Sequence, residues 1–259
     1  MSNRIANAFE NKKAFIGFLT AGDPTYEASY ENFMALINAG ADLVEIGIPF
    51  SDPIAEGPVI QGADVRALNG GMTTDRAFEL AARIRSQTDI PLVFMAYLNP
   101  VFKYGCDRFF AKCAQIGVDG LICPDMPFEE KHEADDAAKR HGISIISMIA
   151  PTSEERIKLI AESAEGFLYI VSSLGVTGVR SEIKTDLGSI MASVKKYAHV
   201  PAAIGFGISS PEQAKKMSQL ADGVIVGSAL VRLVERFGEN AAPEIGKLAK
   251  GLAEAVHNA

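Results

Sequence analysis

The sequence is poor in the residues that build disulfides and metal sites. Its 259 residues include three cysteines, four histidines and no tryptophan. The cysteines, Cys106, Cys113 and Cys123, form no CxxC pair, so we expect reduced thiols in a cytoplasmic protein. The histidines lack HxxxH or HExxH spacing, so we expect no metal site.

Long apolar runs and basic runs are also missing. No stretch approaches the roughly 18 apolar residues of a membrane-spanning helix. The first residues, MSNRIANAFENKK, contain no apolar segment of the kind that signal peptides carry. Asp and Glu number 32 against 25 Lys and Arg. Nucleic acids and anionic membranes both require a basic surface, so we expect neither as a partner.

Eight short apolar runs alternate with longer amphipathic segments, without a break in composition. The runs cover residues 14–20, 42–48, 91–97, 118–123, 143–149, 166–172, 201–206 and 222–228. Runs that are apolar on both faces, with spacers of helix length, are typical of buried parallel strands. Eight such units in about 250 residues predict one (β/α)8 barrel domain over residues 1–259, with an extra N-terminal helix. A doubly wound open sheet is the alternative, but it usually has fewer strands.

Two segments are longer than an ordinary connection from strand to helix. They are residues 49–71 after the second run and residues 173–186 after the sixth. Both leave the C-terminal ends of strands, where barrel enzymes carry their catalytic residues. Long connections in compact domains are usually functional, so we expect lids over a site. A disordered surface loop is the alternative for the second segment.

Glu45 lies in the middle of the second apolar run. Strand alternation places it on the same face as Leu43 and Gly47, pointing into the barrel. An unpaired carboxylate there would cost several kcal/mol, so Glu45 should be partnered or protonated. A salt bridge within the sheet is disfavoured because none of the eight runs contains Lys or Arg. Burial raises a carboxyl pKa toward neutrality, which suits a general acid and base.

Glycines follow the last two runs. Gly205 and Gly207 close the seventh run before a helix start at Ser209, and Gly227 and Ser228 close the eighth. Small residues let a phosphate approach the N–H groups of a helix N-terminus, and barrels often hold phosphate at this place. The alternative is that these glycines only permit tight turns.

The same end of the barrel carries further candidates. Tyr169 lies in the sixth run, ahead of a glycine-rich loop that can close over a site and exclude water. Other inward-facing residues near the rim are expected to form a flat apolar pocket: Phe18, Tyr97, Ile122, Met148 and Phe206. For each of these residues taken alone, a place in the core is the favoured interpretation.

Several motifs together resemble the tryptophan synthase alpha subunit family. They are PFSDPIAEGPVIQ (49–61) with Glu45 ahead of it, VSSLGVTG (171–178), GFGIS (205–209) and GSA (227–229). They occur in order and at fitting spacing, and the likeness extends over essentially the whole chain. The resemblance implies a lyase of tryptophan biosynthesis that cleaves indole-3-glycerol phosphate to indole and glyceraldehyde 3-phosphate, by a retro-aldol step without a cofactor in this chain.

The resemblance also implies residue roles. Glu45 would be the acid and base, Glu56 would accept a hydrogen bond from the indole N–H, and Tyr169 would lie beside the reacting ring. Thr177 would be the lid residue that helps organise the acid. The positions that match phosphate-binding residues are Gly178, Gly207, Gly227 and Ser228. One position departs from the family: the usual pattern is Ala-Asp-Gly-Pro, whereas Glu56 adds a methylene. A carboxylate displaced by about 1 Å can cost up to ~100-fold in rate.

The family works as an αββα complex with a beta subunit that carries pyridoxal phosphate and receives the indole through a tunnel. Asp52, Pro53 and Asn99 match positions that contact this partner. Spacing alone favours a solvated side chain for Asp52, and it does not show that Glu56 returns to face Glu45.

Two other functions stay open at this stage. A different phosphate-binding barrel, such as a phosphosugar isomerase or epimerase, would need other inward groups, often a strand Lys or His or a metal cluster. A non-catalytic subunit could keep the barrel only to bind and regulate a partner. This chain lacks the groups that the first alternative needs, and Glu45, Tyr169 and the glycines argue against the second.

Overall fold

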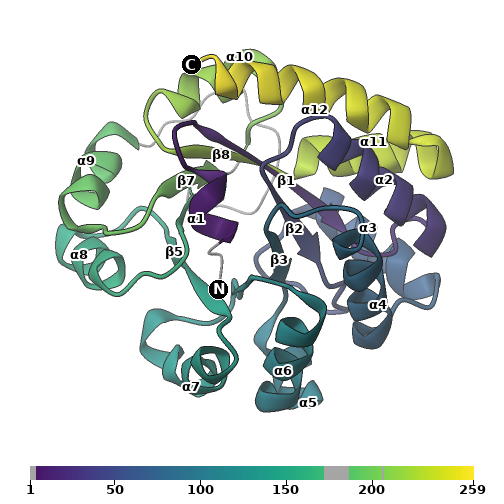
Figure 1. Cartoon of the computed structure of the whole chain (residues 1–259), viewed down its shortest axis with the longest axis horizontal. Helices are drawn as coiled ribbons and strands as arrows, with labels where there is room; N and C mark the ends of the chain where they lie inside the picture. Colours follow the sequence, from purple (N-terminus) through teal and green to yellow (C-terminus); the bar gives the residue numbers. More distant parts are fainter. Residues whose placement is uncertain (1–3, 172–186, 206) are drawn as a thin grey trace.

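The computed structural model describes residues 4–171, 187–205 and 207–259. Eight parallel strands form a closed barrel in which each strand pairs with its neighbours in sequence, and the eighth pairs with the first. Helices surround the barrel, as Figure 1 shows in a view along its axis. The predicted (β/α)8 fold is therefore confirmed.

All eight predicted runs are strands, and most are shorter than the run that predicted them. Their bounds are β1 Ala14–Thr20, β2 Leu43–Gly47, β3 Leu92–Met95, β4 Gly120–Ile122, β5 Ser144–Ile149, β6 Leu168–Val171, β7 Ala202–Gly205 and β8 Gly223–Val226. The apolar residues beyond these bounds continue into the connections at the ends of the barrel.

The helices follow the amphipathic spacers. The α-helices of the described residues are α1 Arg4–Ala8, α2 Tyr26–Asn38, α3 Pro58–Asn69, α4 Thr74–Arg85, α5 Leu98–Tyr104, α6 Cys106–Ile116, α7 His132–Arg140, α8 Glu154–Glu162, α9 Leu187–Tyr197, α10 Pro211–Ser218, α11 Ser228–Phe237 and α12 Ala242–His257. Two 3-10 turns are η1 Phe128–Glu130 and η2 Gly238–Asn240. None of the helices in the described ranges is long and apolar enough to cross a membrane.

Local sequence explains where several helices begin. The Ser210 hydroxyl accepts a hydrogen bond from the Gln213 N–H at 3.3 Å, and Pro211 occupies the first turn of α10. In the long segment after β2, Pro58 begins α3. The expected long loop 49–71 is therefore a shorter loop followed by a helix, because a proline without an N–H is well placed in a first helical turn. The other expected long loop, 173–186, lies outside the described residues.

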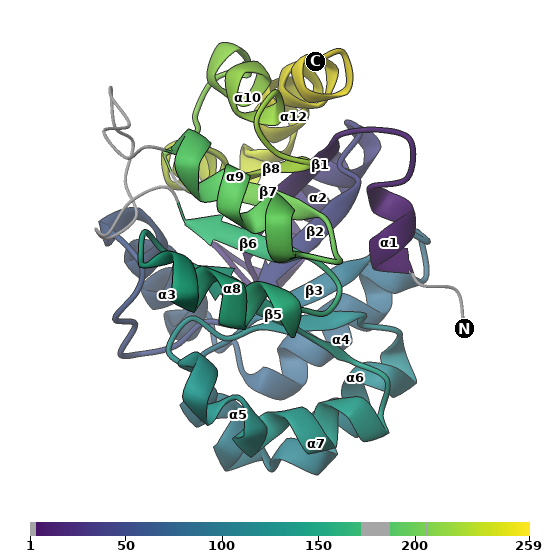
Figure 2. The same ribbon diagram turned by 90° about the vertical axis from the view of Figure 1, so that its left-hand side faces the viewer.

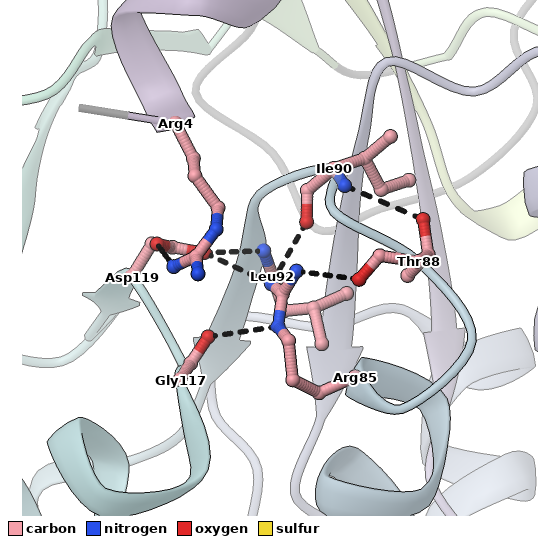
Figure 3. A network of polar contacts seen from close by, with 7 residues as sticks. All are labelled: Arg4, Arg85, Thr88, Ile90, Leu92, Gly117 and Asp119. Atoms are coloured by element: carbon pink, nitrogen blue, oxygen red, sulfur yellow. Dashed lines mark hydrogen bonds and ion pairs between the residues drawn. The ribbon is translucent and has the colours of Figure 1, made fainter. Parts of the chain in front are cut away.

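A network of ion pairs holds the end of the barrel where the strands begin. Arg4 of α1 donates to Asp119 at 2.9 Å, and Arg85 of α4 donates to the other oxygen of the same carboxylate at 3.1 Å (Figure 3). Arg85 also donates to three backbone carbonyls, one of them Gly117 at 3.1 Å. Figure 2 shows α1 at this end and α3 toward the other. The network lies at the opposite end from the connections that follow the strands.

The barrel interior is apolar through most of its depth. The inward cluster includes Ile16, Leu43, Val93, Ile122, Ile146, Tyr169, Ala203 and Ile225. Glu45 lies two residues beyond Leu43 on β2, opposite Phe18 of β1 and Val93 of β3. Because side chains two residues apart share a face, the Glu45 carboxyl lies above the apolar layer, toward the C-terminal rim.

Candidate active site

A cavity opens at the C-terminal rim of the barrel. Its empty volume, open mouth included, is about 700 Å³. The strands contribute Phe18, Glu45, Met95, Met148, Tyr169 and Ile225, and the segments after them contribute Ala55, Glu56, Ile60, Pro124, Gly207, Ile208, Gly227 and Ser228. Its walls are thus mainly apolar, with two carboxyls and one phenol among them.

Glu45 is the most deeply buried acid of this cavity, with 1% of its surface exposed. Burial raises its pKa to about 8. Within the described ranges, its Oε1 atom has no hydrogen-bond partner. A carboxyl in these surroundings holds its proton at neutral pH, so Glu45 can act as a proton donor and, once ionised, as a base.

Glu56 reaches the same cavity from the loop after β2. The hydroxyl of Tyr97 donates to its Oε2 atom and accepts a hydrogen bond from the Ala55 N–H at 2.8 Å. Gln61 fixes the loop by donating to the Glu56 carbonyl at 2.9 Å. Burial raises the Glu56 pKa, whereas the Tyr97 hydroxyl opposes the rise. The two carboxyls therefore differ in their surroundings, because Glu56 has a donor that stabilises its anion.

Tyr169 of β6 lines the cavity and is 6% exposed. Burial, with the nearby carboxyls of Glu45 and Glu56, raises the pKa of its phenol, so the phenol stays neutral. On the neighbouring strand, Gly205 lies under the phenol: a Cβ at Gly205 would lie 2.6 Å from the Tyr169 hydroxyl oxygen. Gly205 therefore provides the space in which the ring lies, a contact that sequence reasoning did not predict.

Backbone of the last two connections forms another part of the wall. Gly207 has a φ of +76°, a left-handed conformation that favours glycine. Gly227 and Ser228 lie at the N-terminus of α11, which runs to Phe237. The first N–H groups of a helix have no partner within it and, with the helix dipole, they favour an anion. This part of the cavity can bind a phosphate.

Only some of the other predicted site residues line the cavity. Phe18 and Met148 line the cavity, and Tyr97 lines a smaller cavity beside it. Ile122 is fully buried in the inner apolar cluster and, unlike Tyr169 and Ile225 of the same cluster, does not line the cavity. Phe206, Thr177 and Gly178 lie outside the described residues.

Sequence reasoning missed several lining residues, among them Ile60, Met95, Pro124, Ile208 and Ile225. Ile225 and Met95 could have been found by strand alternation in the last and third runs. Ile60 depends on how α3 packs against the barrel, which the sequence pattern does not specify.

The residues expected to contact a partner lie on the surface near this rim. Asp52 and Asn99 are exposed and line one shallow groove, together with Phe50 and Tyr104. Pro53 is half-buried, and the next residue, Ile54, is 74% exposed. A large apolar side chain this exposed beside a groove is compatible with a protein contact.

No group of three or more His, Cys, Asp or Glu side chains that could hold a metal ion occurs in the part of the chain that the structure describes. The described residues around the apolar cavity offer carboxyls, a phenol and backbone N–H groups.

Comparison with known proteins gives the family. The family model described as tryptophan synthase alpha chain matches residues 5–257. The chain belongs to the tryptophan synthase alpha chain family. The alpha chain of Lacticaseibacillus casei is 48% identical over 256 residues, covering 99% of this chain and 96% of that protein. As a member of this family, the protein is an enzyme, a carbon–carbon lyase of tryptophan biosynthesis.

Solved structures of the family agree with the fold. A tryptophan synthase alpha chain from Legionella pneumophila is 35% identical, with a TM-score of 0.89 and coverage of 100% of this chain and 98% of that chain. A chain of the tryptophan synthase complex from Pyrococcus furiosus is 34% identical, with a TM-score of 0.85 and coverage of 94% and 99%.

Proposed function

We propose that this chain cleaves indole-3-glycerol phosphate to indole and glyceraldehyde 3-phosphate by a retro-aldol reaction, in the cytoplasm. The observation that carries the proposal is the pair of buried carboxyls in one apolar cavity. Glu45 has burial as the cause of its raised pKa, whereas Glu56 has the Tyr97 hydroxyl as a donor to its anion. Two carboxyls in opposed surroundings can divide acid and base roles.

Glu45 is the proton donor in this reaction. Its carboxyl protonates the ring carbon of indole that bears the glycerol chain, and the ring nitrogen becomes cationic. The Glu56 carboxylate accepts a hydrogen bond from the indole N–H and stabilises this positive charge. The Glu45 carboxylate then takes the proton of the adjacent glycerol hydroxyl, the C–C bond breaks, and its electron pair returns to the ring. Glu45 is protonated again at the end, so the step balances without an added group.

The rest of the cavity positions the substrate. Tyr169, Phe18 and Met148 contact the flat ring, and the phosphate binds beside Gly207, Gly227 and Ser228, where α11 begins. By the family resemblance, Gly178 completes the phosphate site and Thr177 closes over the acid.

The partner in this proposal is a tryptophan synthase beta subunit that carries pyridoxal phosphate, in an αββα assembly through which indole passes. The exposed Ile54 and the groove lined by Asp52 and Asn99 support a contact at the rim. The Pyrococcus furiosus relative was solved as a tryptophan synthase complex. Binding of the beta subunit orders the connections around the site and raises the rate of cleavage.

The test is release of indole from indole-3-glycerol phosphate, with and without beta subunit. We expect slow release by the isolated chain, a faster rate in the complex, and a loss of about 10²- to 10⁴-fold in Glu45→Gln. Matched circular dichroism spectra control for folding. Substantial activity of Glu45→Gln would remove Glu45 from its role, and an equal rate with and without the partner would refute the coupling. No indole from either sample would favour a regulatory subunit or another sugar-phosphate enzyme.

A further inference from the structure

Asp64 is a buried acid that the proposed reaction does not use. It lies on α3 and is 6% exposed. Ile60 and Asp64 lie four residues apart on α3, so they share one face of the helix, and Glu56 lies in the loop just before its N-cap. Glu56, Ile60 and Asp64 all line a small, partly open space beside the active-site cavity, together with Tyr97.

The volume open to the centre of a water molecule is about 10 Å³ in this space, against about 70 Å³ in the active-site cavity, so the space is close to the smallest that holds one water molecule. Polar groups reach it from two directions: the carboxyls of Glu56 and Asp64, and the phenol of Tyr97. A water molecule is held in a buried space when it has two or more polar partners, so this space has both the size and the partners.

The charges around Asp64 oppose its ionisation. Burial is the main cause that raises its pKa to about 8, and the carboxylates of Glu56 and Asp23 add to the rise, whereas a hydrogen bond with the Phe50 backbone opposes it. The nearby cation, Arg66, forms a two-point ion pair with Asp23, at 2.7 and 2.8 Å.

Helix α11, which packs against α3, adds another acid to these surroundings. The negative charge of its Glu235 raises the pKa values of Asp23 and Arg66. Within the described residues, no cation is among the groups that lower the pKa of Asp64.

We propose that Asp64 is a positioning residue for Glu56, and that the two carboxyls share one proton across the water-sized space, with the proton on Asp64 and the negative charge on Glu56. The proposal rests on the proposed role of Glu56. Two carboxyls without a neighbouring cation do not both ionise at neutral pH. The charge resides on Glu56 because the Tyr97 hydroxyl already donates to that side chain. Asp64 donates to Glu56 through the bridging water.

This arrangement gives the longer acid at position 56 a second fixed contact. The Tyr97 hydroxyl holds the Oε2 atom, and the water from Asp64 restrains the carboxylate from the side of α3. The restraint compensates for the extra methylene of Glu56 relative to the usual aspartate. The proton on Asp64 also prevents a second negative charge from competing for the indole N–H.

The direct test is a carboxyl ¹³C NMR titration of the full chain, labelled at the side-chain carboxyl of aspartate. We expect one aspartate signal that is still protonated at neutral pH and titrates in the alkaline range, and we expect Asp64→Asn to remove it. Asp52→Asn is the matched control, because it removes an exposed aspartate and leaves the alkaline signal in place. If every aspartate of the wild type titrates in the acid range, the proposal is overturned.

A second titration follows glutamate carboxyls. In the wild type, the Glu56 signal should have the chemical shift of an ionised carboxylate at neutral pH. The same signal should shift again when Asp64 loses its proton. Asp64→Asn should abolish that second shift. If the Glu56 carboxyl is still protonated at neutral pH, the shared proton lies on Glu56 and not on Asp64, and the proposal is overturned.

Indole release provides a kinetic readout in the complex with beta subunit. We expect Asp64→Leu to lose about ten-fold in kcat through the lost water contact, and Asp64→Asn to restore most of that loss, because the amide is a neutral donor. Equal kcat values for Asp64→Leu and wild type would refute the positioning role. The NMR titration needs no activity, so a chain that releases no indole would reject the proposed function without deciding this inference.

Discussion

Glu45 should make the stability of this protein fall as the pH rises, and Glu45→Gln should remove that part of the dependence. The side chain is almost fully buried, and its pKa lies near 8 in the folded chain against 4.5 for an ordinary glutamate. A pKa raised by folding means that the folded state binds the proton more tightly than the unfolded state. The contribution to stability is complete below the ordinary pKa and is lost as the pH rises through the folded pKa.

The magnitude follows from the two pKa values. Each pKa unit corresponds to about 1.4 kcal/mol at 25 °C. Between pH 4.5 and pH 8, ionisation of Glu45 therefore removes about 5 kcal/mol from the free energy of unfolding. That is a large share of the roughly 5 to 15 kcal/mol that stabilises a typical protein, so the effect is measurable.

The assay is equilibrium unfolding in urea at about pH 5 and about pH 9, for wild type and Glu45→Gln. Other buried acids, Asp64 among them, also titrate in this range, so the quantity to compare is the difference between the two proteins. Glu45→Gln should gain several kcal/mol relative to wild type at the higher pH. If the free energy of unfolding changes equally in the two proteins between these pH values, a buried, protonated Glu45 is refuted.

Two further substitutions test the surroundings of the carboxyls. Tyr97→Phe removes the donor that lowers the Glu56 pKa, so the acid limb of the pH profile of kcat/KM should move to higher pH. An acid limb at the same pH as in wild type would contradict that contact. Gly205→Ala puts a Cβ 2.6 Å from the Tyr169 hydroxyl, so it should cost about 1 to 3 kcal/mol in urea unfolding and slow indole release. Gly246→Ala in α12 is the matched control, since its nearest contact is 3.8 Å and helical alanine should be neutral or stabilising; equal effects at both glycines would refute the packing argument.

Much of the fold could be predicted from local pattern. The eight apolar runs predicted eight strands because a parallel strand buried on both faces needs no alternation of polar residues, and the helical spacers allow only parallel neighbours. Strand ends were predicted too long, since an apolar residue that leaves the barrel at its rim stays buried under the connecting segments. Ser210 and Pro211 predicted the start of α10 because a cap acts within four residues.

Position within a strand also predicted which way Glu45 points, because side chains alternate along a strand. The sequence alone therefore determined the barrel and the inward acid at position 45. Only the tertiary structure placed Glu56 against Tyr97, Asp64 beside both, and Gly205 beneath Tyr169. These contacts join residues from different strands and connections, and closure of the barrel sets their distances. No periodicity of a few residues carries that information.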